Sequence, residues 1–133
     1  MVYFEKANVV HAGDLVFNKI YPVVDHPGGA SLKGWVKSLD DVAKMYPADA
    51  LYIFGHGRPS AGVVGTREDL SRQREFFEGL LAYTQKQIDA GKAKSEIVAL
   101  ANLPGFEAWH DPLPNRLGLC LGAAYDELAP KTT

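Results

Sequence analysis

The chain has only one cysteine, Cys120, so it can form neither an intrachain disulfide nor a cysteine-based zinc site. It also lacks an excess of basic residues, because 14 Lys and Arg stand against 16 Asp and Glu, for a formal net charge of -2. Without a basic stripe, nucleic acid and anionic lipid are not expected partners. No apolar run is long enough to cross a membrane, and Met1 to Lys6 does not resemble a signal peptide, which favours a cytoplasmic location.

What the chain does have is the composition of one globular domain. Its 133 residues are 47% hydrophobic and 23% charged, which supplies enough apolar material for one core but not two. No internal repeat, low-complexity segment or interdomain linker is evident. We therefore expect residues 1–133 to form a single domain.

The first residues alternate short apolar runs with turns. Met1 to Phe4 and Val9 to Ala12 flank a polar turn at residues 5–8, a pattern that predicts two strands joined as a hairpin. The second strand is expected to end at Gly13-Asp14, and residues 23–29 read as a loop rich in proline and glycine.

A helix and a buried strand are expected next. From Ser31, apolar residues recur every three or four positions, which predicts a helix that ends before Pro47. The run Leu51 to Phe54 predicts a strand buried on both faces, because its apolar positions are consecutive. That strand leads directly into Gly55-His56-Gly57.

The second half of the chain reads as helical. Residues 58–65 are expected to be a loop, and Thr66 with Asp69 resembles a capping box that starts a long helix reaching Gly91. Two further helices are predicted, at Ser95 to Leu103 and at Asn115 to Leu128.

Two residues, Asp14 and His56, are candidate metal ligands. Asp14 and His56 each follow an apolar strand and a glycine, and ligand sites in α/β folds gather where strands end and loops diverge. A carboxylate and an imidazole are ordinary zinc ligands. The simpler alternatives are a turn residue for Asp14 and a loop histidine for His56.

Three segments together resemble the second half of metallo-β-lactamase-fold hydrolases. They are Ala12-Gly13-Asp14-Leu15, the helix start from Gly28 to Trp35 of the type Gly-Gly-x-Ser-x-x-Gly-Trp, and Gly55-His56-Gly57. The resemblance covers roughly residues 1–91. It implies that Asp14 bridges two metal ions, zinc or another divalent metal, and that His56 completes the shell of the second.

The resemblance also implies a fold class. We expect an α/β fold that is the C-terminal half of the αββα sandwich, with a short mixed sheet flanked by helices. Residues 92–133 are expected to add a helical extension to this half-fold.

The chain lacks the motif that supplies most of the family's metal ligands. His-x-His-x-Asp-His occurs nowhere in the sequence. A catalytic zinc usually takes three protein ligands, whereas Asp14 and His56 supply two. We therefore expect weak or absent metal binding and no hydrolysis by the isolated chain.

Three hypotheses follow for function. The leading one is a partial metal-dependent hydrolase domain, a truncated product or one piece of a split enzyme. The second is a non-catalytic interaction or small-molecule-binding module built on the half-fold. The third is an unrelated α/β domain in which the motifs occur by chance. If the half-fold is present, its uncovered sheet face predicts a homodimer or binding to the missing N-terminal half.

Other polar residues are weaker candidates. Asp25 and His26 lie in a loop that the family uses near its substrate, so they are candidate substrate-binding residues, with a solvated loop as the alternative. His11 is three positions before Asp14 in a strand, so it should point to the opposite face, which favours a core or hydrogen-bonded role over metal ligation. His110 reads as a surface or helix-end residue. Cys120, between two leucines, reads as a core residue rather than a nucleophile.

Overall fold

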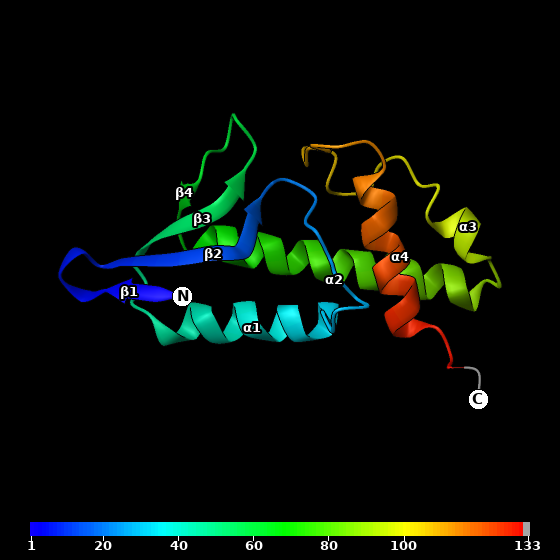
Figure 1. Ribbon diagram of the computed structural model, residues 1–133, viewed down its shortest axis with the longest axis horizontal. Coiled ribbons are helices and arrows are strands. Elements are labelled where there is room, and N and C mark those ends of the chain that lie inside the picture. Colours follow the sequence, from blue (N-terminus) through cyan, green and yellow to red (C-terminus); the bar gives the residue numbers. More distant parts are fainter. Residues whose placement is uncertain (132–133) are drawn as a thin grey trace.

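The computed structural model describes residues 1–131 and has an α/β architecture. Four strands lie side by side in chain order and form one small mixed sheet (Figure 1). The outer pairs are antiparallel, and the central pair is parallel. The α/β class and the short mixed sheet are therefore confirmed. The strands are β1 (Val2–Phe4), β2 (Val9–Asn18), β3 (Leu51–Gly57) and β4 (Val64–Gly65).

The predicted hairpin is present, but its second strand is longer than expected. A single 3-10 turn, Glu5–Ala7, joins β1 to β2, and Val2 pairs with His11. β2 does not end at Gly13-Asp14. Gly13 has a φ of 54°, in the left-handed region that glycine adopts easily, and the pairing with β3 shifts register there. The strand thus bends at Gly13 and continues to Asn18.

Two helices begin and end where the sequence predicted. In α1 (Leu32–Met45), the Ser31 hydroxyl accepts a hydrogen bond from the Gly34 amide at 3.0 Å. In α2 (Arg67–Asp89), the Asp69 carboxylate accepts from the Thr66 amide at 2.9 Å, so the capping box is confirmed. Gly91 follows α2 with a φ of 78°, as expected of a residue beyond a helix C-terminus.

Two sequence predictions in the second half were wrong. Residues 58–65 contain β4, which pairs with β3 through Ile53 and Val64. The helix expected over Ser95 to Leu103 is only one turn, α3 (Lys94–Ile97). Leu103 precedes a proline, which disfavours helical geometry, and it is buried in the core at 1% exposure. The chain therefore leaves the helix after Ile97 so that both apolar side chains reach the interior.

The two faces of the sheet differ in coverage. Val10, Tyr52 and Phe54 point towards α1 and α2 and are almost fully buried. Their neighbours along the strands point the other way, because side chains alternate between faces. We call that second side the open face; it carries Val2, Phe4, Val9, His11, Leu51, Ile53 and Val64, which the strand pairing places together.

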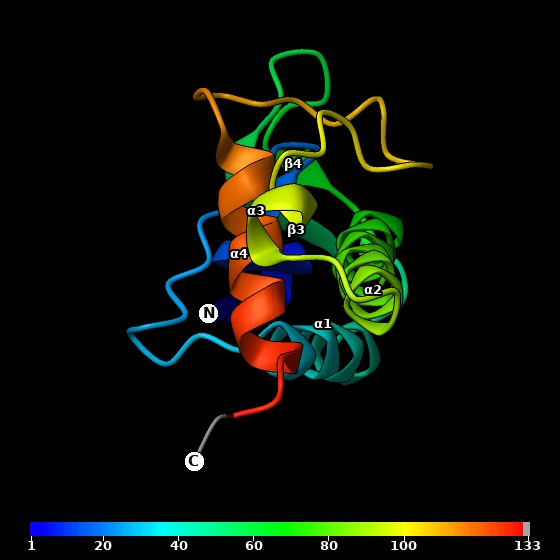
Figure 2. The ribbon, with the colours of Figure 1, turned by 90° about the vertical axis from the view of Figure 1, so that its right-hand side faces the viewer.

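The last helix, α4 (Arg116–Leu128), packs across α2 at the end of the molecule rather than over the open face (Figures 1 and 2). Its Glu127 carboxylate accepts hydrogen bonds from the Leu32 amide at 2.7 Å and the Lys33 amide at 3.1 Å. α4 thereby caps the N-terminus of α1. No helix within residues 1–131 is both long and apolar enough to cross a membrane.

Candidate functional site

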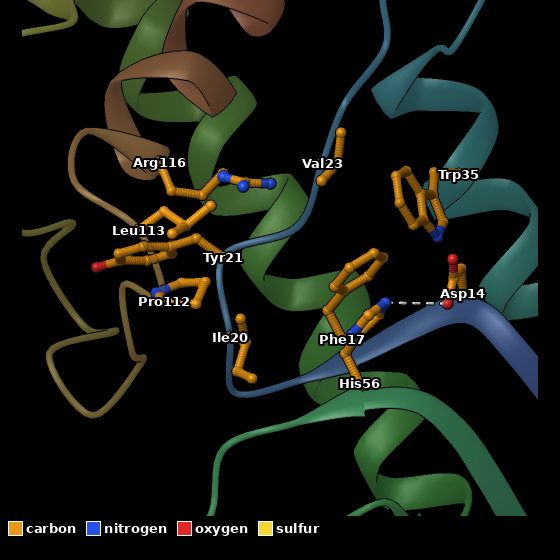
Figure 3. A pocket seen from close by; sticks show the side chains of 10 residues that line it. All are labelled: Asp14, Phe17, Ile20, Tyr21, Val23, Trp35, His56, Pro112, Leu113 and Arg116. Atoms are coloured by element: carbon orange, nitrogen blue, oxygen red, sulfur yellow. Dashed lines mark ion pairs between the residues drawn. The ribbon is translucent and has the colours of Figure 1, made fainter.

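A cavity of about 540 Å³ opens beside the C-terminal part of β2 (Figure 3). Its walls come from β2, the following loop, α1, β3 and the segment that leads into α4. Most of the lining side chains are apolar or aromatic, and the charged ones are few, as in small-molecule sites. The lining residues are Asp14, Phe17, Ile20, Tyr21, Val23, Trp35, His56, Pro112, Leu113 and Arg116.

Asp14 and His56 meet at one side of this cavity. The Oδ1 atom of Asp14 lies 3.4 Å from the Nε2 atom of His56. Their side chains are 71% and 54% exposed, so both can be reached from solvent. Gly55 makes the approach possible, because a Cβ atom at that position would overlap the Asp14 carboxylate. The bend at Gly13 and the small residue at Gly55 thus bring the two side chains together.

An aromatic stack orients the His56 ring. The ring lies parallel to Phe17 at a centroid distance of 4.7 Å and an interplanar angle of 11°. The Phe17 amide in turn donates a hydrogen bond to Oε1 of Gln73 at 3.0 Å. Gln73 is 1% exposed, so a buried side chain of α2 fixes the strand segment under His56.

Helix α1 contributes the opposite wall through Trp35. Its indole Nε1 donates to the Leu15 carbonyl at 2.8 Å, which holds the ring against β2. The ring also contacts Phe77 at a centroid distance of 4.6 Å and Phe17 at 6.2 Å. The wall is therefore packed on both sides.

The segment before α4 closes the cavity. The Tyr21 amide donates to the His110 carbonyl at 3.1 Å, and the His110 amide donates to the Lys19 carbonyl at 2.8 Å. This short parallel bridge places Pro112, Leu113 and Arg116 against the loop after β2. The residues beyond 92 thus complete the cavity instead of forming a separate appendage.

The other predicted polar residues are not part of the Asp14–His56 pair. His11 is exposed on the open face, so the core role expected of it was wrong. Asp25 accepts a hydrogen bond from the Gly28 amide at 3.0 Å, and His26 contacts the Ala30 carbonyl at 3.2 Å. His110 is exposed. Within residues 1–131, no group of three or more His, Cys, Asp or Glu side chains is arranged to hold a metal ion.

Cys120 is a core residue, as predicted. It is 1% exposed, and its thiol donates to the Pro22 carbonyl at 3.2 Å. Burial raises the pKa of the thiol to about 12, so the reactive thiolate is not formed at neutral pH.

Three important residues were missed in the sequence. Phe17 looked like one more apolar residue of a strand, and its stacking on His56 depends on the bend at Gly13. Gln73 was detectable in principle, because it lies three residues after Leu70 on the buried stripe of α2, where an apolar residue is usual. Arg116 gave no signal, because the loop that brings it to the cavity has no regular pattern.

No protein-family model matches the chain, and no curated protein matches it significantly. The resemblance to metallo-β-lactamase-fold hydrolases therefore depends on the sequence motifs around Asp14 and His56 and on the helix start from Gly28 to Trp35.

Proposed function

We propose that this chain is part of a metal-dependent hydrolase domain of the metallo-β-lactamase type, in which Asp14 and His56 are two of the metal ligands. The proposed fold is the C-terminal half of that family's sandwich. The hydrolytic site is incomplete without ligands from elsewhere.

The separation of the two donor atoms is the observation that carries this proposal. Two ligands of one tetrahedral zinc, each about 2.0–2.1 Å from the ion, lie about 3.3–3.4 Å apart. The Asp14 and His56 donors are 3.4 Å apart. A carboxylate oxygen and an imidazole nitrogen are also the donor types that zinc accepts. The pair thus fits two positions of a zinc shell.

The surrounding residues suit the same role. The stacked Phe17 ring holds the imidazole plane in place, and Gln73 holds Phe17, so the histidine needs little reorganisation before it binds an ion. A metal ion in a hydrolase supplies an acidified water and polarises the substrate. The apolar cavity beside the pair can hold the body of a substrate next to that point.

The donor set is incomplete, which defines the alternative function. A catalytic zinc takes three protein ligands, and no third candidate joins the pair among the described residues. We therefore assign no hydrolytic step to the isolated chain. The cavity is lined mainly by apolar side chains, and this lining favours a non-catalytic small-molecule-binding module as the second candidate.

The open face supports the proposed partner. Val2, Phe4 and Leu51 are each about half exposed there, at 54%, 52% and 47%. A contiguous apolar face of this kind usually marks an interface. Because His11 is the one polar residue among those that define this face, two copies related by a twofold axis can place mainly apolar side chains against each other. We propose a homodimer for the isolated chain, and the N-terminal half as the competing partner when it is present.

Zinc titration followed by NMR tests the metal proposal. Zinc should shift the imidazole signals of His56 and the amide signals of Asp14 and Gly55 at millimolar concentrations, and these shifts should disappear in Asp14→Asn. Affinity should be weak, because two ligands cannot replace the water shell of the ion as three or four do. The isolated chain should show no metal-dependent hydrolysis of lactone, thioester or phosphodiester substrates.

Matched controls separate this site from unspecific binding. Glu75→Gln removes an exposed carboxylate of α2, and His110→Gln removes an exposed histidine near the cavity; both should leave the zinc-induced shifts at His56 intact. Equal shifts at all four histidines would contradict the proposed pair. Stoichiometric submicromolar binding lost in Asp14→Asn, or turnover lost in His56→Gln, would show that the site is complete and that the incomplete-site proposal is wrong.

A further inference from the structure

Arg116 differs from the other four arginines of this chain in the partners of its side chain. Four of the five bind a partner: Arg58 bonds the Ala108 carbonyl, Arg67 bonds the Tyr46 carbonyl at 3.1 Å, and Arg72 and Arg74 pair with carboxylates. Arg116 takes part in none of the ion pairs of residues 1–131. Its Nε atom is buried without a hydrogen-bond partner, as are those of Arg67 and Arg74, but the guanidinium groups of those two arginines bind partners through their terminal nitrogens.

This unpaired cation lines the same cavity as Asp14 and His56. In Figure 3 the Arg116 side chain extends from the start of α4 towards Val23, while Asp14 and His56 lie on the other side of the cavity. Apolar side chains, including Ile20, lie between the two groups. The cavity therefore has a positively charged end at Arg116, an apolar middle, and a carboxylate and an imidazole side by side at its far end.

A partly buried guanidinium without a partner is costly, since burial removes water that would otherwise solvate the charge. A ligand carboxylate would offset that cost, because its two oxygens match the fork of N–H donors on arginine. At the other end, the negative charge of Asp14 repels a second anion. An elongated monocarboxylate would therefore bind in one orientation, with its carboxylate at Arg116.

We propose that Arg116 is a carboxylate-binding residue, and that the substrate class is a carboxylic acid whose apolar body separates the carboxylate from the hydrolysable group. This inference deepens the proposed function, on which it rests for the assignment of the Asp14–His56 side as the reacting end. The carboxylate-binding part concerns only the cavity and Arg116, so it can be tested without metal.

The test compares three probes of the same length on the full chain in the presence of a chelator. Hexanoate, hexan-1-ol and hexylammonium are titrated while the fluorescence of Trp35, a residue of the cavity wall, is followed. Hexanoate should bind about tenfold more tightly than hexan-1-ol, because a charge-assisted hydrogen bond typically contributes that much, and hexylammonium should bind most weakly. A Trp35→Phe variant shows which part of the signal comes from the cavity.

Substitutions then assign the preference to Arg116. Arg116→Gln should weaken hexanoate binding about tenfold and leave hexan-1-ol binding unchanged, whereas Arg116→Lys should keep part of the preference. Arg72→Gln, which removes an exposed cation on α2, should change neither affinity. The comparison of probes on the unmodified chain stands even where a variant folds poorly.

The outcomes separate this inference from the proposed function. Equal binding of hexanoate and hexan-1-ol, or an unchanged preference in Arg116→Gln, would show that Arg116 is not a carboxylate-binding residue, whatever zinc does at His56. A clear preference for hexanoate together with no zinc effect at His56 would support the carboxylate site and contradict the metal site.

Discussion

The two faces of the sheet are built from the same strands, yet one is a core and the other is a surface. On the covered face, Val10 and Tyr52 are 0% exposed beneath α1 and α2. On the open face, Phe4 is 52% exposed and Leu51 is 47% exposed. Both sets are apolar, so the difference lies in what packs on them rather than in residue type.

The sequence predicted that the strand at Leu51 to Phe54 is buried on both faces, and this was wrong, because Leu51 is 47% exposed. A strand exposed to water on one face usually alternates apolar and polar residues, whereas Leu51 to Phe54 is apolar at every position. The described residues cover only the face towards α1 and α2. The sequence pattern of the open face therefore fits a second covering layer, which the proposed homodimer or the N-terminal half would supply.

The largest expected difference in stability is between removing an aromatic ring on the covered side of the sheet and removing one on the open face. Phe77, at 0% exposure, packs against Trp35 and Phe76, so Phe77→Ala should lower the free energy of unfolding by about 3–5 kcal/mol. Phe4→Ala removes a ring that is half exposed, and it should cost less than about 1 kcal/mol. Urea unfolding at low protein concentration measures both. Equal losses would mean that the two faces are equally packed.

A smaller effect is expected when a charge is placed on the open face. Leu51→Glu should weaken the proposed homodimer by about 2 kcal/mol, roughly thirtyfold in the dissociation constant, because the carboxylate would be buried against apolar side chains. Leu119→Glu is the matched control, since Leu119 on α4 is 62% exposed but far from the paired strands. Light scattering after size exclusion gives the masses. A stable monomer at micromolar concentration, without dye binding to apolar surface, would contradict the homodimer.

The helices and strands could be predicted from the sequence where interactions between nearby residues define their ends. The Ser31 and Thr66 hydroxyls cap α1 and α2 by accepting hydrogen bonds from amides within three residues, and both helix starts were predicted correctly from the sequence. His56 lies at the end of β3, as the sequence predicted, but the strand end predicted at Asp14 was wrong, because β2 continues to Asn18. The 3.4 Å separation of Asp14 and His56 could not be predicted, since it depends on the register shift at Gly13.

Non-local contacts account for what the sequence did not reveal. Arg116 reaches the cavity only because the His110 backbone pairs with Lys19 and Tyr21, about ninety positions earlier in the chain. β4 is two residues long and exists through its pairing with β3, so it has no pattern of its own. The helix predicted from Ser95 onwards gave way to the burial of Leu103, a case of tertiary packing outweighing local periodicity.

The smallest expected effect concerns Glu127, which joins α4 to the covered side of the molecule by capping α1. Burial alone would raise the pKa of this carboxyl, but hydrogen bonds from the Leu32 and Lys33 amides and the Ser31 hydroxyl outweigh it and hold the pKa below its ordinary value. Glu127→Gln should lower the free energy of unfolding by about 1 kcal/mol at neutral pH, as the loss of a helix cap does.

The pH dependence of that loss identifies its cause. Because folding lowers the pKa of Glu127, its stabilisation is present above the pKa of the unfolded chain and is lost as pH falls through the lowered pKa of the folded chain. The difference between the unmodified chain and Glu127→Gln should therefore shrink in urea unfolding series between about pH 7 and about pH 3. Glu75→Gln, which neutralises an exposed glutamate of α2, should show no such convergence. A difference that stays constant across the series would mean that Glu127 stabilises the chain by packing rather than by the charge of its carboxylate.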